Sequence, residues 1–214
     1  MARRQWRCVD NVILFPLVSV NLMHETLIFG GSFDPVHNGH IAMLDAAVAH
    51  VSPAATLVIP VGNAWQKARM PFAAARHRVA MLKLAMPQAT VDERELTRGG
   101  PTYSVDTMRE LKGDHPTTRF VWLLGGDAFS RIDSWEEPVK LASMVRFVVV
   151  RRAGDTIVPP KTPLTYDIIA CDPPDVSSTM IRAKLAEGSV DHEVARNFVP
   201  AAVYDYIQQH KLYS

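Results

Sequence analysis

The sequence predicts a single α/β domain built on a doubly wound parallel sheet with helices on both faces. Short apolar runs alternate along the chain with segments whose apolar residues recur at helical spacing. The chain has 214 residues, of which 48% are hydrophobic, and this suffices for one domain with a substantial core. In Rossmann-like sheets of this kind, ligands bind beyond the carboxyl ends of the strands, so functional residues are expected there.

Six apolar runs predict the strands of the sheet. They are residues 27–29, 55–61, 89–92, 119–124, 145–150 and 166–171. The fourth run leads directly into Gly125, Gly126 and Asp127. Parallel strands place their carboxyl ends at one edge, so this glycine turn is expected close to the one that follows the first strand.

Helical spacing between and after these runs predicts five helices. In the first of them, Ile41, Leu44, Val48 and Val51 share one face. Ser104 is the expected N-cap of the third. The five segments are residues 41–51, 76–86, 104–111, 178–187 and 200–209.

The strand-to-helix junction at residues 30–40 has the sequence Gly-Gly-Ser-Phe-Asp-Pro-Val-His-Asn-Gly-His. A glycine turn between a strand and a helix offers backbone N–H groups and a positive helix end to a phosphate. His37 and His40 lie at the helix start, where imidazole can donate hydrogen bonds to phosphate oxygens. The alternative is a tight turn with two surface histidines.

Charge and cysteine content exclude several classes of function. The 23 basic and 22 acidic side chains give a net charge of +1, which argues against a polybasic nucleic-acid surface. Cys8 and Cys171 suggest neither a disulfide framework nor a zinc site, and a reducing cytoplasm is the natural setting. No run approaches the roughly 18 apolar residues of a membrane span.

Two motifs together resemble those of the HxGH nucleotidyltransferase superfamily. The first is His37-Asn38-Gly39-His40, and the second is Ser177-Ser178-Thr179-Met180-Ile181-Arg182, which fits the pattern S/T-x-T-x-x-R. Further segments resemble the bacterial nicotinate-mononucleotide adenylyltransferases, and the likeness spans about residues 25–213. These segments are residues 59–67, 94–108, 125–129 with Trp135, and 198–213.

The resemblance implies an enzyme of NAD biosynthesis that joins ATP to nicotinate mononucleotide, giving deamido-NAD and pyrophosphate. It implies Mg²⁺ carried by the ATP phosphates, small-molecule substrates, no nucleic acid or membrane partner, and a cytoplasmic location; a homo-oligomer stays open. The nucleophile is a phosphate oxygen that is already ionised near neutral pH, so no catalytic base is needed. The resemblance implies that His37, His40 and Arg182 align the substrates and neutralise the charge on the leaving pyrophosphate.

The resemblance also assigns binding residues on both sides of the reacting phosphate. ATP is expected at Gly30, Gly31, Ser32, Phe33, His37, His40, Gly125, Asp127, Ser177, Thr179 and Arg182. The mononucleotide is expected at Lys67, Thr102, Tyr103, Ser104 and Trp135. Simpler structural roles are open for several of these. Ser177 also fits a plain N-cap, Asp127 a turn, Lys67 a solvated side chain and Trp135 a core residue.

Three departures from the family pattern leave the exact substrate open. Residues 64–66 read Ala-Trp-Gln in place of the commoner Pro-Pro-His or Pro-Trp-His, Thr102 and Ser104 exchange the usual serine and threonine, and Ala153 replaces a proline. The first two lie where selectivity for the mononucleotide is expected. The alternatives are an enzyme for the amidated mononucleotide, a pantetheine-phosphate adenylyltransferase and a nucleotide-binding module without turnover.

Residues 1–22 are expected to be an extension outside the core, which residues 23–214 form. The basic start and the apolar run 12–18 superficially mimic a signal peptide, but Pro16 breaks the run and no small-residue cleavage site follows. Met23 lies four residues before Leu27, in the first strand, and is an alternative start.

Removal of residues 1–22 is therefore expected to leave the melting temperature and the activity nearly unchanged, because this segment shows no strand or helix pattern that would pack against the core. Thermal unfolding and turnover of the truncated chain, beside the full chain, test this. A melting temperature many degrees lower would assign the run 12–18 to the core.

Overall fold

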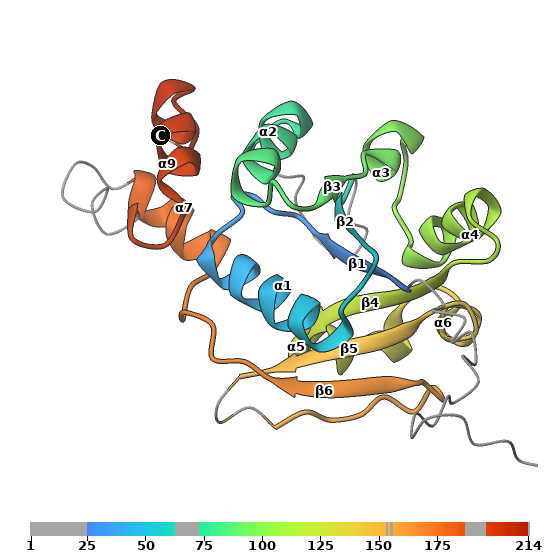
Figure 1. Ribbon diagram of the computed structural model, residues 1–214. Helices are drawn as coiled ribbons and strands as arrows, with labels where there is room; N and C mark the ends of the chain where they lie inside the picture. The colour runs from blue at the N-terminus through green and yellow to red at the C-terminus, as the bar shows by residue number, and fades with distance from the viewer. Residues whose placement is uncertain (1–24, 63–72, 153, 155, 187–195, 214) are drawn as a thin grey trace, which may run out of the picture.

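The computed structural model describes residues 25–62, 73–152, 154, 156–186 and 196–213, and contains one six-stranded parallel sheet (Figure 1). The strand order is β3-β2-β1-β4-β5-β6, and every neighbouring pair is parallel. The strands are β1 (Glu25–Gly31), β2 (Ala55–Pro60), β3 (Thr90–Val91), β4 (Arg119–Gly125), β5 (Arg146–Arg151) and β6 (Tyr166–Ala170). This order confirms the predicted doubly wound α/β fold, and it places the switch point between β1 and β4.

The longer helices cover the two faces of the sheet and include all five that the sequence predicts. They are α1 (Asn38–Val51), α2 (Ala75–Ala85), α4 (Ser104–Asp114), α7 (Ser178–Ala186) and α9 (Ala201–Gln209). Short helical segments join them: α3 (Arg94–Arg98), α5 (Gly126–Phe129), the 3-10 turn η1 (Ile132–Ser134) and α6 (Pro138–Ala142). The sequence did not predict these four, because three to five residues are too few to show a helical period.

Two apolar clusters fill the space between sheet and helices. The first packs α1, α2, α7 and α9 on one face, through residues such as Leu44, Leu82 and Ile181. The second packs α4, α5 and α6 on the other face, around Met108 and Phe147. The central strand β4 supplies both clusters, because Val121 and Leu123 point to the first and Phe120, Trp122 and Leu124 to the second. A strand buried on both faces reads as a continuous apolar run.

Two boundaries differ from the expectation in ways that concern the site. Helix α1 begins at Asn38 with His37 as its N-cap, so both histidines of the motif belong to the helix start. Helix α4 begins at Ser104 with Tyr103 as its N-cap, and the Tyr103 side chain makes no capping hydrogen bond. The expected Ser104 cap is therefore wrong by one position.

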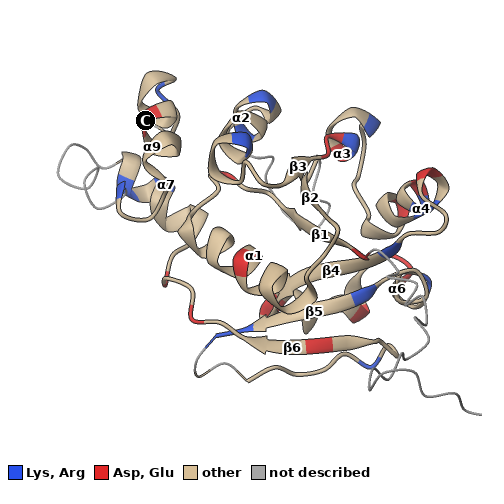
Figure 2. Cartoon of the chain, in the orientation of Figure 1, with Lys and Arg blue, Asp and Glu red and all other residues tan. Residues whose placement is uncertain are grey.

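Basic and acidic residues are both scattered over the molecule (Figure 2). In the part of the chain that the structure describes, no helix has the length and hydropathy needed to cross a membrane. Residues 1–22 and Lys67 lie outside the described residues, so the predictions about them stay predictions.

Candidate active site

The first turn of α1 is built by a reciprocal contact between two histidines. The backbone N–H of His40 donates to Nδ1 of His37 at 3.3 Å, and the backbone N–H of His37 donates to Nδ1 of His40 at 3.2 Å. The two rings stack with centroids 3.7 Å apart. Each imidazole thus replaces the side-chain oxygen of a usual capping box. The His37 amide, which the helix leaves without a partner, is satisfied in this way, and the His40 amide also donates to the His37 carbonyl at 2.9 Å.

This contact fixes the tautomer of both rings. A neutral imidazole carries one proton, and a nitrogen that accepts a hydrogen bond cannot hold it. Because Nδ1 accepts in both rings, the proton of each neutral ring is on Nε2. Each histidine therefore offers one Nε2–H donor to a ligand.

His37 is held in its neutral form by its surroundings. The residue is only 6% exposed. Burial lowers the pKa of His37 to about 4, and the positive charge of Arg152 adds to the effect. At neutral pH His37 therefore donates a hydrogen bond without carrying a charge. His40 is half-buried, and its ring lies edge-on to Phe33, with centroids 5.0 Å apart.

The turn before α1 is anchored from several sides. Asp34 is 3% exposed, and its Oδ1 accepts from the amide of Ala73 at 3.1 Å and the hydroxyl of Tyr213 at 2.7 Å. Arg78 is 2% exposed and donates from Nη1 to the carbonyls of Ser32 and Val61, both at 2.9 Å. Neither the Asp34 side chain nor Arg78 was identified from the sequence.

The second motif lies directly beside this turn, at the start of α7. Arg182 donates from Nη1 to the carbonyl of Asp34 at 2.6 Å and from Nη2 to Oγ1 of Thr179 at 3.1 Å. The hydroxyl of Ser178 donates to the carbonyl of Pro35 at 2.9 Å. Residues about 140 positions apart are thus joined by hydrogen bonds, and the guanidinium of Arg182 is held beside the histidine turn.

Ser177 directly precedes α7, and Thr179 lies in the first turn of that helix. The hydroxyl of Ser177 accepts from the amide of Met180 at 3.2 Å, which is an N-cap contact. Both side chains are exposed. The simpler N-cap role of Ser177 is therefore present, and a hydroxyl in that position still has room for a further hydrogen bond.

Glycines allow the close approach that the turn needs. A Cβ on Gly39 would lie 3.1 Å from the His37 ring and 3.2 Å from Val176, just before the second motif. A Cβ on Gly31 would lie 2.9 Å from the ring of Phe33. Phe33 itself is 1% exposed, so its ring is not available to a nucleotide.

Comparison with known proteins agrees with this geometry. The family model described as Cytidylyltransferase-like matches residues 28–184. A relative from Methylibium petroleiphilum named nicotinate-nucleotide adenylyltransferase is 36% identical over 194 residues, covering 87% of this chain and 91% of its own. A relative of the same name from Bordetella petrii is 36% identical over 197 residues, covering 87% and 97%.

The chain belongs to the nicotinate-nucleotide adenylyltransferase family. It is a nucleotidyltransferase, as the two motifs predicted. The fold is shared with the Plasmodium falciparum nicotinic acid mononucleotide adenylyltransferase complexed with NaAD, at a TM-score of 0.73. That likeness has 23% identity and covers 89% of this chain and 97% of the other.

The remaining residues expected at ATP lie at the ends of the neighbouring strands. Gly30 and Gly31 end β1, and Gly125 ends β4, the strand paired with β1. Asp127 is exposed in the short helix α5 directly after β4. These residues share the carboxyl edge of the sheet with the histidine turn, as the parallel topology predicted.

The residues expected at the mononucleotide lie at the start of α4 and after η1. Thr102 is 7% exposed, and Tyr103 and Ser104 are half-buried. Trp135 is half-buried and, like Tyr103, packs against the second apolar cluster. Trp135 therefore has the core contact that was the simpler interpretation, while part of its ring surface stays accessible.

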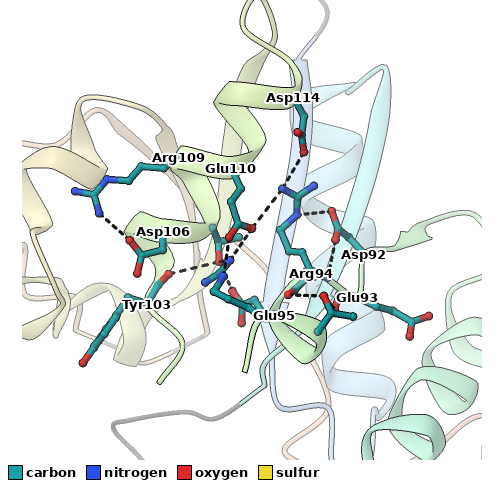
Figure 3. Close-up of polar contacts among 12 residues, drawn as sticks. Asp92, Glu93, Arg94, Glu95, Tyr103, Asp106, Arg109, Glu110 and Asp114 are labelled. Atoms are coloured by element: carbon teal, nitrogen blue, oxygen red, sulfur yellow. Dashed lines mark hydrogen bonds and ion pairs between the residues drawn. The ribbon is translucent and has the colours of Figure 1, made fainter. Parts of the chain in front are cut away.

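A polar network joins α3 to α4 beneath this region (Figure 3). Glu95 is 6% exposed and accepts from the hydroxyl of Thr107 at 2.7 Å. Burial raises the pKa of Glu95 to about 7, although the Thr107 hydrogen bond and the charge of Arg98 oppose this. Arg98 pairs with both oxygens of Glu110, at 2.7 and 2.8 Å. The network thus ties together α3 and α4, the two helices that the segment 99–103 connects.

Arg152 is a residue that the sequence analysis missed. It follows β5 directly, so its position at the carboxyl edge was predictable by the same rule that selected the other strand ends. Its charge acts on His37 and therefore reaches the site. Ala153, the departure beside it, lies outside the described residues.

The buried state of His37 predicts a specific pH dependence of stability. Its folded-state pKa of about 4 lies below the ordinary 6.5. As pH falls below 6.5, the unfolded chain binds a proton that the folded chain does not. The stabilising contribution is complete above pH 6.5 and is lost toward pH 4. Between pH 7 and pH 5, the unfolding free energy is expected to fall by about 2 kcal/mol more in the wild type than in His37→Asn, which keeps a capping oxygen.

Urea unfolding at both pH values measures this difference, and parallel pH profiles for the two proteins would refute it. The control is Glu95→Gln. The pKa of Glu95 is raised to about 7, so the folded chain binds the extra proton in the same range and gains stability as pH falls. Glu95→Gln is therefore expected to lose more stability than the wild type on acidification, the opposite of His37→Asn.

Proposed function

We propose that this chain transfers the adenylyl group of ATP to nicotinate mononucleotide, forming deamido-NAD and releasing pyrophosphate. The observation that carries the proposal is the reciprocal His37–His40 contact beside Arg182, within a chain of this family. A phosphate oxygen of the mononucleotide attacks the α-phosphorus of ATP, and the bond from that phosphorus to the bridging oxygen of pyrophosphate breaks. Charge then accumulates on the leaving pyrophosphate.

The chain's own residues supply donors to that charge. The Nε2–H groups of His37 and His40 are fixed by the capping contact, so they need no reorientation during the reaction. Arg182 adds a positive charge, anchored by its bond to the Asp34 carbonyl. Such preorganised donors stabilise the charge that develops in the transition state more than any charge in the bound substrates, and this difference raises the rate.

No side chain has to remove a proton from the nucleophile. A phosphate monoester has a second pKa of about 6, so the attacking oxygen is already ionised at neutral pH. The low pKa of His37 does not suit it to receive a proton either. Holding the two phosphates in line is therefore the main catalytic task.

Mg²⁺ fits this site as a companion of ATP. When bound, it would offset negative charge on the phosphate oxygens. Among the described residues, no group of three or more His, Cys, Asp or Glu side chains could hold a resident ion. Asp127, exposed after β4, is the residue we assign to the ATP ribose or to the ion. A cytoplasmic location fits the same proposal.

The start of α4 is suited to bind a pyridine ring that carries a carboxylate. The first amides of a helix have no partner within it, and the helix dipole adds positive potential there. We propose that the amides at Tyr103 and Ser104 receive the carboxylate of nicotinate, while Trp135 stacks on the ring. Lys67 is proposed to contact the mononucleotide phosphate.

The test of the function is pyrophosphate release from ATP with one acceptor offered at a time: nicotinate mononucleotide, nicotinamide mononucleotide or 4′-phosphopantetheine. Release with the first acceptor supports the proposal. Preference for either of the other two acceptors assigns the chain to that branch. If no acceptor led to pyrophosphate release, the chain would be a nucleotide-binding module without turnover.

His40→Ala is expected to lower kcat by about 10²- to 10³-fold, because a fixed donor to the developing charge is lost. The side chain also caps α1, so a loss of about 1 kcal/mol in unfolding free energy is expected as well. Initial rates and urea unfolding separate the two effects.

The matched control is His50→Ala. His50 lies in the last turn of the same helix and pairs with Asp167 at an exposed site, so its loss should leave kcat unchanged. Near wild-type kcat in His40→Ala would remove His40 from the mechanism.

Nicotinate mononucleotide is expected to give a kcat/KM about 10- to 100-fold above that of its amide. The NH₂ group of the amide would place a donor against the backbone donors of the pocket, which costs about 1–3 kcal/mol. Steady-state rates with both substrates measure the ratio. Comparable values would indicate dual specificity. The exchange of Thr102 and Ser104 would then be the first candidate for its cause.

A further inference from the structure

The turn that presents the two histidines is strained and needs to be held. Phe33 adopts φ of 47°, a left-handed conformation that is unfavourable for a residue with a side chain. The residue is buried, and its ring contacts those of Phe29 and His40. Strained backbone of this kind persists only where surrounding contacts over-determine it. The contacts on both sides of Phe33 are therefore part of the site.

Asp34, the next residue, is where these contacts converge. Its carbonyl accepts from Arg182 at 2.6 Å, and its Oδ1 accepts from the amide of Ala73 and the hydroxyl of Tyr213. On the other side of Phe33, the carbonyl of Ser32 accepts from buried Arg78. The turn is thus bound to α7, to α2 and the segment just before it, and to Tyr213, which follows α9.

The Tyr213 hydroxyl donates to Oδ1 of Asp34 at 2.7 Å, a shorter hydrogen bond than the one from the Ala73 amide. The two residues are 179 positions apart in the sequence. The ring packs against the first apolar cluster together with Leu212, just after α9, and α9 lies beside α2 (Figure 1). Burial and the charge of Asp34 raise the pKa of Tyr213 above its usual value, so its hydroxyl stays a donor at any working pH. A hydrogen bond to a charged acceptor is stronger than one between neutral groups.

We propose that Tyr213 is a positioning residue of the adenylyl transfer, acting through Asp34 to hold the turn that presents His37 and His40. This rests on the proposed function. Tyr213 does not touch the reacting atoms in this account. It restricts the backbone of residues 33–35, and through them the N-cap of α1, so that the two Nε2–H donors stay aligned with the leaving pyrophosphate.

The variant that tests this is Tyr213→Phe, which keeps the packed ring and removes only the hydroxyl. Its kcat is expected to fall about tenfold with KM for ATP within about twofold, because alignment in the transition state is lost rather than ground-state affinity. The matched control is Tyr206→Phe, in α9. Its hydroxyl bonds to His77 at 3.0 Å, away from the turn, so kcat should stay within about twofold of the wild type.

A double-mutant cycle shows whether Tyr213 acts through Asp34. Asp34→Asn keeps an acceptor oxygen and should retain most of the activity, whereas Asp34→Ala should not. Tyr213→Phe added to Asp34→Ala should then cause no further loss of kcat. A further tenfold loss in the double variant would overturn the proposal.

The ¹⁵N chemical shifts of the imidazole nitrogens give a readout that needs no activity. In the wild type, both rings should show the Nε2–H tautomer; in Tyr213→Phe, these signals should shift toward averaged tautomers, and in Tyr206→Phe they should not. Unchanged signals with wild-type kcat in Tyr213→Phe would overturn the proposal, and so would equal losses of kcat in both tyrosine variants. If the wild type released no pyrophosphate with any acceptor, the proposed function would fail, and the NMR comparison would still test the link to the turn.

Discussion

The reciprocal hydrogen bonding of His37 and His40 is the contact on which the rest of the site depends. Both rings use Nδ1 to cap α1, which determines where each proton lies and which way each ring can turn. The capping contact thereby gives the site two oriented donors, the Nε2–H groups of His37 and His40. Serine or aspartate at these positions could cap the helix equally well but would not present an N–H to a phosphate.

The surroundings of the turn follow from that requirement. Gly39 leaves space for the His37 ring and for the approach of the second motif, and Phe33 accepts a left-handed backbone to bring the chain around. Arg182 binds the turn from outside and Arg78 from beneath. Each of these residues sits where a bulkier or shorter side chain would either open the turn or leave a buried backbone carbonyl without a partner.

Topology explains why the site forms at this point of the sheet. β1 and β4 are central neighbours, and the chain winds in opposite directions from them; in sheets of this kind ligands bind beyond the carboxyl ends of such a pair. The first motif follows β1, Gly125 and Asp127 follow β4, and Arg152 follows β5. The buried Glu95–Thr107 contact joins α3 to α4 and supports the segment proposed to bind the pyridine ring. The exposed ion pairs around it, such as Arg109 with Glu137, contribute little by comparison.

The sequence by itself determined the fold class, all six strands and the five longer helices, because apolar periodicity is a local signal that extends over each of these segments. It also determined the family, because the two motifs stand in the right order and at the right distance. The tertiary structure alone decided which groups hold the site: nothing local to Asp34, Arg78 or Tyr213 indicates that they meet. It also decided the neutral state of His37, since burial and the charge of Arg152 come from elements distant in sequence. A pKa depends on solvent exposure and on neighbouring charges, and both exist only once the chain has folded.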